Sequence, residues 1–578
     1  MFKLFRNLKK RDAMLILLCI VLIFVQVWLD LKLPDYMQEV TVLVQTPNAA
    51  MSDILRTGGN MLLCAFGSLL ASVMVAFCVA YVATGFGANL RQKLFDRVQA
   101  FSMEEIGRFS TASLITRSTN DITQVQILLV MGLQVIVKAP ITAAWAIVKI
   151  ADKSWQWTLS TAVAVGILLC LVGIVMIVVM PKFKKLQRMT DDLNRVTREN
   201  LTGIRVVRAY NAEHYQEEKF DEANDNLTGT HLFTQRAMAT MMPTIGLVMN
   251  GLSLAIYWIG AYLINTATID MKIELFSNLV TFLSYAMQVV MSFMMLVAIF
   301  IILPRASVSA KRILEVLETK PRILDGTQTE GLSKGTVEFR NVSFRYPDAK
   351  EAAVRNISFT AKQGETVAFI GATGSGKSTV INLIPRFYDA TEGVVLVDGR
   401  DVREYTQEAL HAKLGYVSQK AVLFSGSIES NVNFGDNDCT DVRPAIETAQ
   451  AAEFVEKMHD GTKSYVAQGG TNLSGGQKQR VSIARAVARN PEILIFDDSF
   501  SALDYKTDRT VRDALSTACA DATRLIVAQR IGTIRDADRI VVLDEGEVAG
   551  IGTHKELMQN CETYRQIAYS QLSKEELE

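Results

Sequence analysis

The chain has 578 residues, of which 49% are hydrophobic, and its 60 Lys and Arg residues balance 60 Asp and Glu residues. This length predicts two or more domains, and the lack of a basic surplus argues against a nucleic-acid-binding protein. The cysteines form no CxxC or Cys/His cluster in the sequence, so neither a zinc site nor a disulfide framework is predicted.

Long apolar runs dominate residues 1–310. The runs long enough to cross about 30 Å of hydrocarbon lie at residues 13–33, 58–85, 126–150, 156–180, 243–266 and 275–303. The first run is longer than a signal-peptide core and no small-residue cleavage site follows it, so we expect a span. The opening MFKLFRNLKKRD mixes basic and apolar residues and predicts a short amphipathic helix on the inner membrane surface.

Basic residues indicate the orientation of these spans. Lys and Arg are abundant between spans two and three (residues 86–125) and between spans four and five (residues 181–242), whereas the 34–54 stretch contains none. The positive-inside rule therefore predicts that the N-terminus and the C-terminal domain are cytoplasmic. Both basic connections are long and helix-patterned, so we expect helices that extend the spans into the cytoplasm and touch the soluble domain.

The composition changes after a linker rich in turn residues. We expect a transmembrane domain of six α-helices with long cytoplasmic extensions at residues 1–310, a linker at 311–335, and an α/β phosphate-loop nucleotide-binding domain at 336–578.

A phosphate loop lies near the start of the soluble part. GATGSGKST follows the strand-patterned GTVEFRNVSFRY and ETVAFI and precedes a helix pattern. Its glycines allow backbone N–H groups to converge on phosphate oxygens, Lys377 is expected to reach the β- and γ-phosphates of ATP, and Ser378 to bind Mg²⁺. The predicted ATP-binding residues of this loop are Gly371, Thr373, Gly374, Ser375, Gly376, Lys377, Ser378 and Thr379.

A second nucleotide motif is the apolar run ILIF at residues 493–496, which ends in Asp497. A buried strand whose terminal carboxylate meets Mg²⁺ completes what a nucleotide site needs, so Asp497 is the second predicted metal ligand.

Between these motifs lies NLSGGQKQR, residues 472–480. Together with the phosphate loop it resembles the ATP-binding cassette (ABC) family, whose signature is LSGGQ. STASLITRSTNDI and ENLTGIRVVRAYNAEHYQEEKF are similar to the cytoplasmic loops of six-span exporter half-transporters. The resemblance covers nearly the whole chain and implies an ABC-type domain in a bacterial plasma (inner) membrane.

The resemblance also implies roles for individual residues. Tyr346 matches the aromatic residue that stacks on adenine, and Asp504 matches an aspartate that communicates across the dimer. Gln419 matches the glutamine that joins the Mg²⁺ site to the membrane domain, so it is a further predicted Mg²⁺ ligand. The signature binds the ATP of the partner subunit, through Ser474, Gly475, Gly476 and Gln477.

Two positions depart from the family pattern. Asp498 stands where a glutamate normally polarises the attacking water, and Gln529 stands where a histidine normally holds the γ-phosphate. Aspartate is one methylene shorter, and a misplacement of about 1 Å can cost ~10²-fold in rate. Gln529 can donate a hydrogen bond but carries no charge. Gln468, where the family often has a glutamate, also departs.

Weak catalytic groups beside an intact signature predict the degenerate-site subunit of a heterodimer, with a different half-transporter as its partner. A homodimer with tolerated substitutions is the alternative. In span six, a soft stripe suits varied amphiphilic substrates, although packing against other spans explains it equally well; it comprises Ser284, Met287, Gln288, Met291, Met294 and Met295. Lys138 in span three either contacts substrate or has a structural role.

The expected function is ATP-driven export of amphiphilic, drug-like compounds. Export of lipids or peptides is one alternative, and a non-transporting, ATP-gated membrane regulator is another. The expected cofactors are ATP and Mg²⁺, and the expected partners are a second half-transporter, the lipid membrane and a small amphiphilic substrate, but no nucleic acid.

Overall fold

The computed structural model describes residues 2–6, 8–46, 49–151, 153–435 and 441–572. The chain divides into two compact units. One consists of Met1–Val98 and Ala112–Thr319, and the other of Gln99–Thr111 and Lys320–Glu578. The cysteines among the described residues are free thiols, and Cys439 lies outside those residues.

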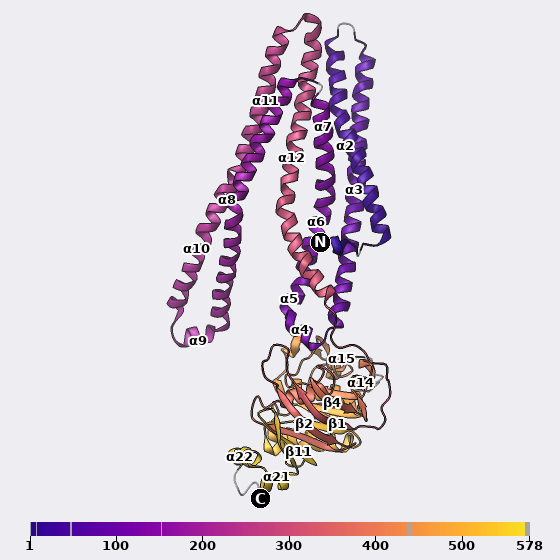
Figure 1. Cartoon of the computed structure of the whole chain (residues 1–578), viewed down its shortest axis with the longest axis vertical. Helices are drawn as coiled ribbons and strands as arrows, with labels where there is room; N and C mark the ends of the chain where they lie inside the picture. Colours follow the sequence, from indigo (N-terminus) through magenta and orange to yellow (C-terminus); the bar gives the residue numbers. More distant parts are fainter. Residues whose placement is uncertain (1, 7, 47–48, 152, 436–440, 573–578) are drawn as a thin grey trace. The chain divides into compact units, whose positions relative to one another are not determined.

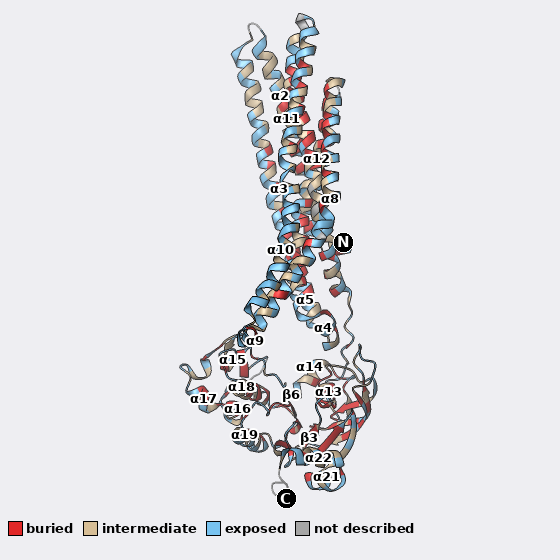
Figure 2. Cartoon of the chain, turned by 90° about the vertical axis from the view of Figure 1, so that its left-hand side faces the viewer, coloured by how far each residue is buried: buried red, intermediate tan, exposed pale blue. Residues whose placement is uncertain are grey.

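The six predicted spans are confirmed. Within the described residues, six helices are long and apolar enough to cross a membrane: Lys10–Gln45, Met51–Gln99, Thr111–Ala151, Trp155–Thr202, Glu213–Thr266 and Met271–Glu318. Most are far longer than a bilayer requires, because a residue rises 1.5 Å along a helix and about 20 residues suffice. Large apolar side chains such as Leu17, Leu62 and Phe77 are exposed. Exposed residues occur along much of the length of these helices (Figure 2).

Both basic connections are helical extensions of the spans, as predicted. Helix α3 (Met51–Gln99) continues beyond its apolar stretch, and α8 (Trp155–Thr202) and α10 (Glu213–Ala239) run side by side, joined through the short helix α9 (Ile204–Ala209) (Figure 1). Helix α4 (Met103–Phe109) belongs to the soluble unit.

Helix α4 is fixed to the linker by charged groups. The Arg322 guanidinium donates to the Glu104 carboxylate at 2.8 Å, and the Arg322 backbone N–H donates to Glu105 Oε1 at 3.2 Å. The first basic connection therefore contacts the soluble unit through α4.

The helix at the N-terminus, α1 (Phe2–Phe5), is shorter than the predicted amphipathic helix. Leu4 is fully buried, and the Phe5 ring stacks on Phe86 of α3 with centroids 5.9 Å apart. Met1 and Asn7 lie outside the described residues.

The core of the membrane unit forms where α2 (Lys10–Gln45), α7 (Ala139–Ala151), α8, α11 (Met241–Thr266) and α12 (Ile269–Glu318) pack together. The third span is interrupted by two π-helical turns, η1 (Arg117–Asp121) and η2 (Leu133–Lys138), on either side of α6 (Ile122–Gly132). Helix α5 (Thr111–Thr116) precedes them.

The soluble unit contains two main sheets. The smaller is antiparallel, in the order β2 (Val354–Ala361), β1 (Val337–Phe344), β4 (Glu392–Val397) and β5 (Arg400–Asp401). The larger has the order β12 (Glu547–Gly552), β11 (Arg539–Asp544), β3 (Thr366–Gly371), β10 (Thr523–Val527), β9 (Ile493–Asp497) and β6 (Leu414–Val417). All neighbouring pairs of this sheet are parallel except β11–β12.

The apolar run ILIF at residues 493–496 lies in strand β9. All its residues are buried, because one hydrophobic cluster covers each face of the larger sheet. A parallel strand buried on both faces is expected to read as a continuous apolar segment.

The topology gathers the nucleotide motifs. Strands β3, β10, β9 and β6 are neighbours and run in the same direction, so their carboxyl ends meet at one edge of the sheet. Ligands of open α/β sheets bind in the crevice outside these carboxyl ends.

Candidate functional site

The phosphate loop connects β3 to helix α13 (Lys377–Leu383). Gly376 has a φ of 93°, in the left-handed region that favours glycine. A Cβ atom there would lie 2.5 Å from Val354 Cγ1 and 2.9 Å from the Ala353 carbonyl oxygen. Both the turn and the close approach of β2 therefore require glycine at this position.

Lys377 lies at the centre of the loop. Its ammonium donates to the carbonyl oxygens of Gly371 at 2.9 Å and Ala372 at 2.7 Å. Burial lowers the pKa of Lys377, although the carboxylates of Asp498 and Asp497 oppose the shift. The ammonium is held where phosphate oxygens of a nucleotide in the loop come within its reach.

The predicted metal ligands Ser378 and Asp497 meet at the start of α13. The Ser378 hydroxyl donates to Asp497 Oδ1 at 2.7 Å. Mg²⁺ prefers oxygen ligands and usually takes only one or two carboxylates in addition to phosphates and waters. This adjacent hydroxyl and carboxylate fit Mg²⁺, and the loop of Gly376 and Lys377 fits the phosphates of ATP.

Burial shifts the pKa of both neighbouring aspartates, Asp497 and Asp498. It raises the pKa of Asp497, and the neighbouring Asp498 carboxylate adds to the rise, while the hydrogen bond from Ser378 and the Lys377 charge oppose it. Burial likewise raises the pKa of Asp498, opposed by Gln419 and Lys377.

Gln529 and Gln419 both donate hydrogen bonds to one carboxylate oxygen of Asp498. Asp498 Oδ2 accepts hydrogen bonds from Gln529 Nε2 at 2.9 Å and from Gln419 Nε2 at 3.2 Å. The Asp498 backbone has a φ of 46°, and its N–H donates to the Val527 carbonyl at 3.0 Å. Loops after β9, β10 and β6 thus hold one carboxylate; whether Gln419 also binds Mg²⁺ stays a prediction.

Tyr346 lies just after strand β1. Its hydroxyl lies 3.1 Å from Thr379 Oγ1, and its ring packs edge-on against Phe344 and Tyr388, with centroids 4.9 and 5.4 Å apart. Phe344 and Tyr388 support this ring, and the sequence did not single them out. An aromatic residue after β1 was recognisable only by its motif position.

These groups enclose a cleft of about 310 Å³. Among the predicted residues, Tyr346, Thr373, Gly374, Gly376, Lys377, Ser378, Thr379, Gln419, Asp498 and Gln529 line it. Ala353 and Val527 line it as well. No sequence signal marked Ala353, whereas Val527 ends the strand that precedes Gln529.

The signature residues lie apart from this cleft and do not contribute to its lining in the described part of the chain. Ser474 caps helix α18 (Gly475–Ala488): Gln477 N donates to Ser474 Oγ at 3.3 Å, and Ser474 N donates to Gln477 Oε1 at 2.9 Å. Ser474 and Gly475 are exposed.

Two further residues flank the signature. Asp504 caps helix α19 (Tyr505–Ala518) by accepting from the Thr507 N–H at 3.0 Å. Gln468 is exposed in a short 3₁₀ turn, and nothing in the structure explains its departure from the family pattern.

Within the membrane unit, the span-six stripe is less buried than the residues between its members, although Met294 packs against the unit's core. Met291 and Met295 are exposed and the other four members are half-buried, whereas the intervening Tyr285, Val289 and Val290 are buried. The Lys138 ammonium lies 3.3 Å from Asp30 Oδ2, so the lysine is ion-paired.

The raised pKa of Asp497 predicts how metal-dependent nucleotide binding depends on pH. The carboxylate must be ionised to hold Mg²⁺, so the Mg²⁺-dependent part of ATP affinity should fall on acidification at a higher pH than an ordinary aspartate would give. Asp498→Asn removes a neighbouring negative charge and should move this midpoint to lower pH. Binding of a fluorescent ATP analogue, measured with and without Mg²⁺ over a series of pH values, gives the midpoint for each variant. Protonation of the nucleotide itself is the same for both variants and cancels in the comparison. Coincident midpoints would contradict the coupling.

Comparison with known proteins shows which protein family the chain resembles. The ABC transporter transmembrane region matches residues 14–293, and the ABC transporter ATP-binding family matches residues 354–501. An uncharacterised ABC transporter ATP-binding protein of Mycobacterium tuberculosis is 39% identical over 549 residues, 93% of each chain. An ATP-dependent lipid A-core flippase of Aromatoleum aromaticum is 30% identical, covering 86% of this chain and 82% of the flippase.

A solved structure of a bacterial Atm1-family ABC exporter with ATP bound has the same fold, with a TM-score of 0.79 at 24% identity. It is covered completely and covers 98% of this chain. The ATPase domain of this family binds ATP with Mg²⁺ and couples its hydrolysis to transport. The chain therefore belongs to the ABC transporter family, as a multi-pass half-transporter of the exporter type in which a six-helix membrane domain is fused to an ATP-hydrolysing domain.

Proposed function

We propose that the chain exports amphiphilic, drug-like compounds across the plasma membrane as one half of a heterodimer. In this proposal its own phosphate loop forms a slow, retentive ATP site, and its LSGGQ signature completes the fast site of a different half-transporter. The N-terminus and the nucleotide-binding domain are cytoplasmic, on the side where the basic connections lie.

The observation that carries the proposal is the environment of Asp498. Its Oδ2 already accepts hydrogen bonds from two neutral amides, those of Gln529 and Gln419. A base that activates water must reach the water at hydrogen-bond distance, and this carboxylate is one methylene shorter than glutamate and held toward the two glutamines. The group is therefore suited to a binding site with slow turnover.

Gln529 has a parallel defect. It cannot become a cation, so it offers the γ-phosphate a hydrogen bond from a neutral amide without the additional charge attraction of a protonated histidine. Its amide is moreover engaged with Asp498 at 2.9 Å. Both departures weaken hydrolysis.

The groups that bind nucleotide are complete. In this proposal Lys377 binds the β- and γ-phosphates, Ser378 and Asp497 bind Mg²⁺, and Tyr346 stacks on the adenine ring. The contact between the Ser378 hydroxyl and Asp497 Oδ1 supports the Mg²⁺ assignment. Bound Mg²⁺ neutralises negative charge that develops between phosphate oxygens. A site that binds well and hydrolyses slowly keeps the dimer closed while the other site turns over.

The intact signature accounts for the proposed asymmetry between the slow and the fast ATP site. Ser474 and Gly475 are exposed at the start of the 14-residue helix α18, whose N-terminal N–H groups attract phosphate. They are thus available to a nucleotide held by another subunit. A partner with an intact glutamate and histidine would supply the catalytic groups that this chain lacks.

Lipid export is the second candidate, because one relative is a lipid A-core flippase that matches 86% of this chain. A lipid is also an amphiphile, and the open methionine stripe of α12 suits an alkyl chain as well as a drug. Peptide export, a homodimer and an ATP-gated regulator remain alternatives with no specific support in the site.

Substrate-stimulated ATP hydrolysis tests the proposal. The chain and a second half-transporter that has the family's glutamate and histidine should be reconstituted together and singly in vesicles, with a panel of amphiphilic drugs and lipids. We expect stimulation and vectorial transport only from the pair. Hydrolysis by the chain alone at the rate of the pair would support a homodimer, and unstimulated hydrolysis would support a regulator.

The asymmetry predicts unequal effects of matched substitutions. Asp498→Asn should lower the ATPase rate of the heterodimer only mildly, because this site contributes little turnover, whereas neutralising the partner's glutamate should nearly abolish it. Steady-state hydrolysis of the two heterodimers, assembled to the same extent, gives the comparison. Equal losses would mean that both sites hydrolyse ATP.

The signature predicts a larger effect from a residue outside this chain's own cleft. Gly476→Asp places a negative charge toward the partner's γ-phosphate, so it should stop turnover and transport more completely than Asp498→Asn while ATP still binds both phosphate loops. Gly476→Ala is the matched control: its Cβ would lie 3.3 Å from the Ala502 carbonyl oxygen, the same position without the charge. An assembled Gly476→Asp heterodimer with near-normal hydrolysis would refute the shared site.

A further inference from the structure

Three spans meet at a charged cluster inside the membrane unit. The Lys138 ammonium of the third span lies 3.3 Å from Asp30 Oδ2 of α2, and the Ser68 hydroxyl of α3 donates to Asp30 Oδ1. All three positions fall within apolar runs long enough to span a bilayer. Ionisable groups at this depth are costly and mark functional sites by default.

The backbone is interrupted on both sides of the pair. Pro34 has no N–H to donate to the carbonyl of Asp30, four residues earlier in α2. In the third span, the π-helical turn η2 ends at Lys138, two residues before Pro140. Isolated π-turns inside helices occur frequently at functional sites.

Helices α2 and α3 also approach closely at this level. A Cβ at Gly67, next to Ser68, would lie 3.1 Å from Leu29 Cδ1, which is a tight contact. The close approach brings the Ser68 hydroxyl to Asp30.

Asp30 and Lys138 differ in how many further hydrogen bonds each can make. Each Asp30 oxygen already has a partner, Ser68 or Lys138. The Lys138 ammonium has three N–H donors, and within the described part of the chain Asp30 is its one charged or hydrogen-bonding partner. The Lys138 side chain is 27% exposed, so a further ligand of this cluster must be an acceptor that reaches the ammonium.

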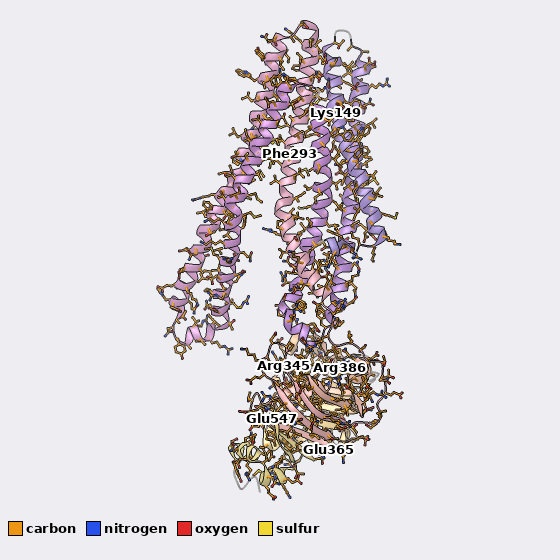
Figure 3. All side chains as sticks on the ribbon, viewed as in Figure 1. Lys149, Phe293, Arg345, Glu365, Arg386 and Glu547 are labelled. Atoms are coloured by element: carbon orange, nitrogen blue, oxygen red, sulfur yellow. The ribbon has the colours of Figure 1, made fainter. Side chains whose placement is uncertain are left out.

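A second charged cluster in the membrane unit is more tightly paired. Lys149, labelled in Figure 3, lies 2.8 Å from Asp35, whose other oxygen accepts from the Tyr285 hydroxyl of α12 at 2.6 Å. Lys32 lies 3.8 Å from the same carboxylate. This tighter cluster ties α2, α7 and α12 together.

We propose that the Asp30–Lys138–Ser68 cluster is a substrate subsite that binds the anionic group, phosphate or carboxylate, of the transported amphiphile. Asp30 and Ser68 position the ammonium, and Lys138 binds the anion. The inference rests on the proposed export function and narrows its substrate class.

Binding to the chain alone tests this subsite without ATP or a partner. The full-length chain in phosphatidylcholine nanodiscs should show saturable binding of radiolabelled dodecyl phosphate. Unlabelled dodecanoate should compete, and dodecyltrimethylammonium should not. Inorganic phosphate in place of the amphiphile distinguishes a site for free anions from one that also needs the alkyl chain.

Two substitutions at the pair should act in opposite directions. Lys138→Met should weaken dodecyl phosphate binding by about tenfold or more, since a charge-assisted hydrogen bond is lost. Asp30→Asn should strengthen it, because the competing carboxylate is removed. Lys138→Arg should retain it, and Lys149→Met is the matched control, expected to leave it unchanged.

A merely structural pair predicts a different pattern. In that case Asp30→Asn and Lys138→Met would weaken binding alike, or neither would change it, and either result would overturn the proposal. If Lys138→Met does not assemble, Asp30→Asn decides: unchanged or weaker binding refutes the subsite. Export and the subsite fail separately, because dodecyl phosphate can bind this chain even where no amphiphile stimulates the pair.

Discussion

The nucleotide site depends on the common direction of four neighbouring strands. Because β3, β10, β9 and β6 are parallel, the loops that follow them converge at one edge of the sheet. Register fixes the details: Val527 pairs with Asp497, and the Asp498 N–H bonds to the Val527 carbonyl at 3.0 Å. The phosphate loop, both aspartates and both glutamines owe their proximity to this ladder rather than to any contact of their own.

The charges gathered at this edge explain why ATP with Mg²⁺ suits the site. Two buried carboxylates, Asp497 and Asp498, lie near one buried ammonium, and burial raises the pKa of both acids. A magnesium ion offsets the negative charge of the two carboxylates and of a polyphosphate, and the Lys377 ammonium also attracts the polyphosphate. Gln529 carries no charge and donates to the Asp498 carboxylate, so the two departures from the family pattern are in direct contact at one carboxylate.

Polar groups in the membrane unit follow a related rule. In hydrocarbon, each charge needs a partner within the protein, and Asp35 meets this need by joining α2, α7 and α12 through Lys149 and Tyr285. The Asp30–Lys138 pair lies where Pro34 and η2 interrupt the helices, with part of the lysine exposed. The first cluster therefore serves packing, while the second has capacity left for a ligand.

The sequence by itself determined the six spans, the strands flanking the phosphate loop and the presence of a nucleotide site, because apolar length, β-patterning and motif spacing are local properties of the chain. It also identified Asp498 and Gln529 as unusual, but only by their positions in motifs. Only the tertiary structure decided that both glutamines donate to one oxygen of Asp498, that Phe344 and Tyr388 support Tyr346, and that Lys138 pairs with Asp30. Apart from the contact between Phe344 and Tyr346, these contacts join residues tens to more than a hundred positions apart. They follow from strand order and helix packing, which no local pattern encodes.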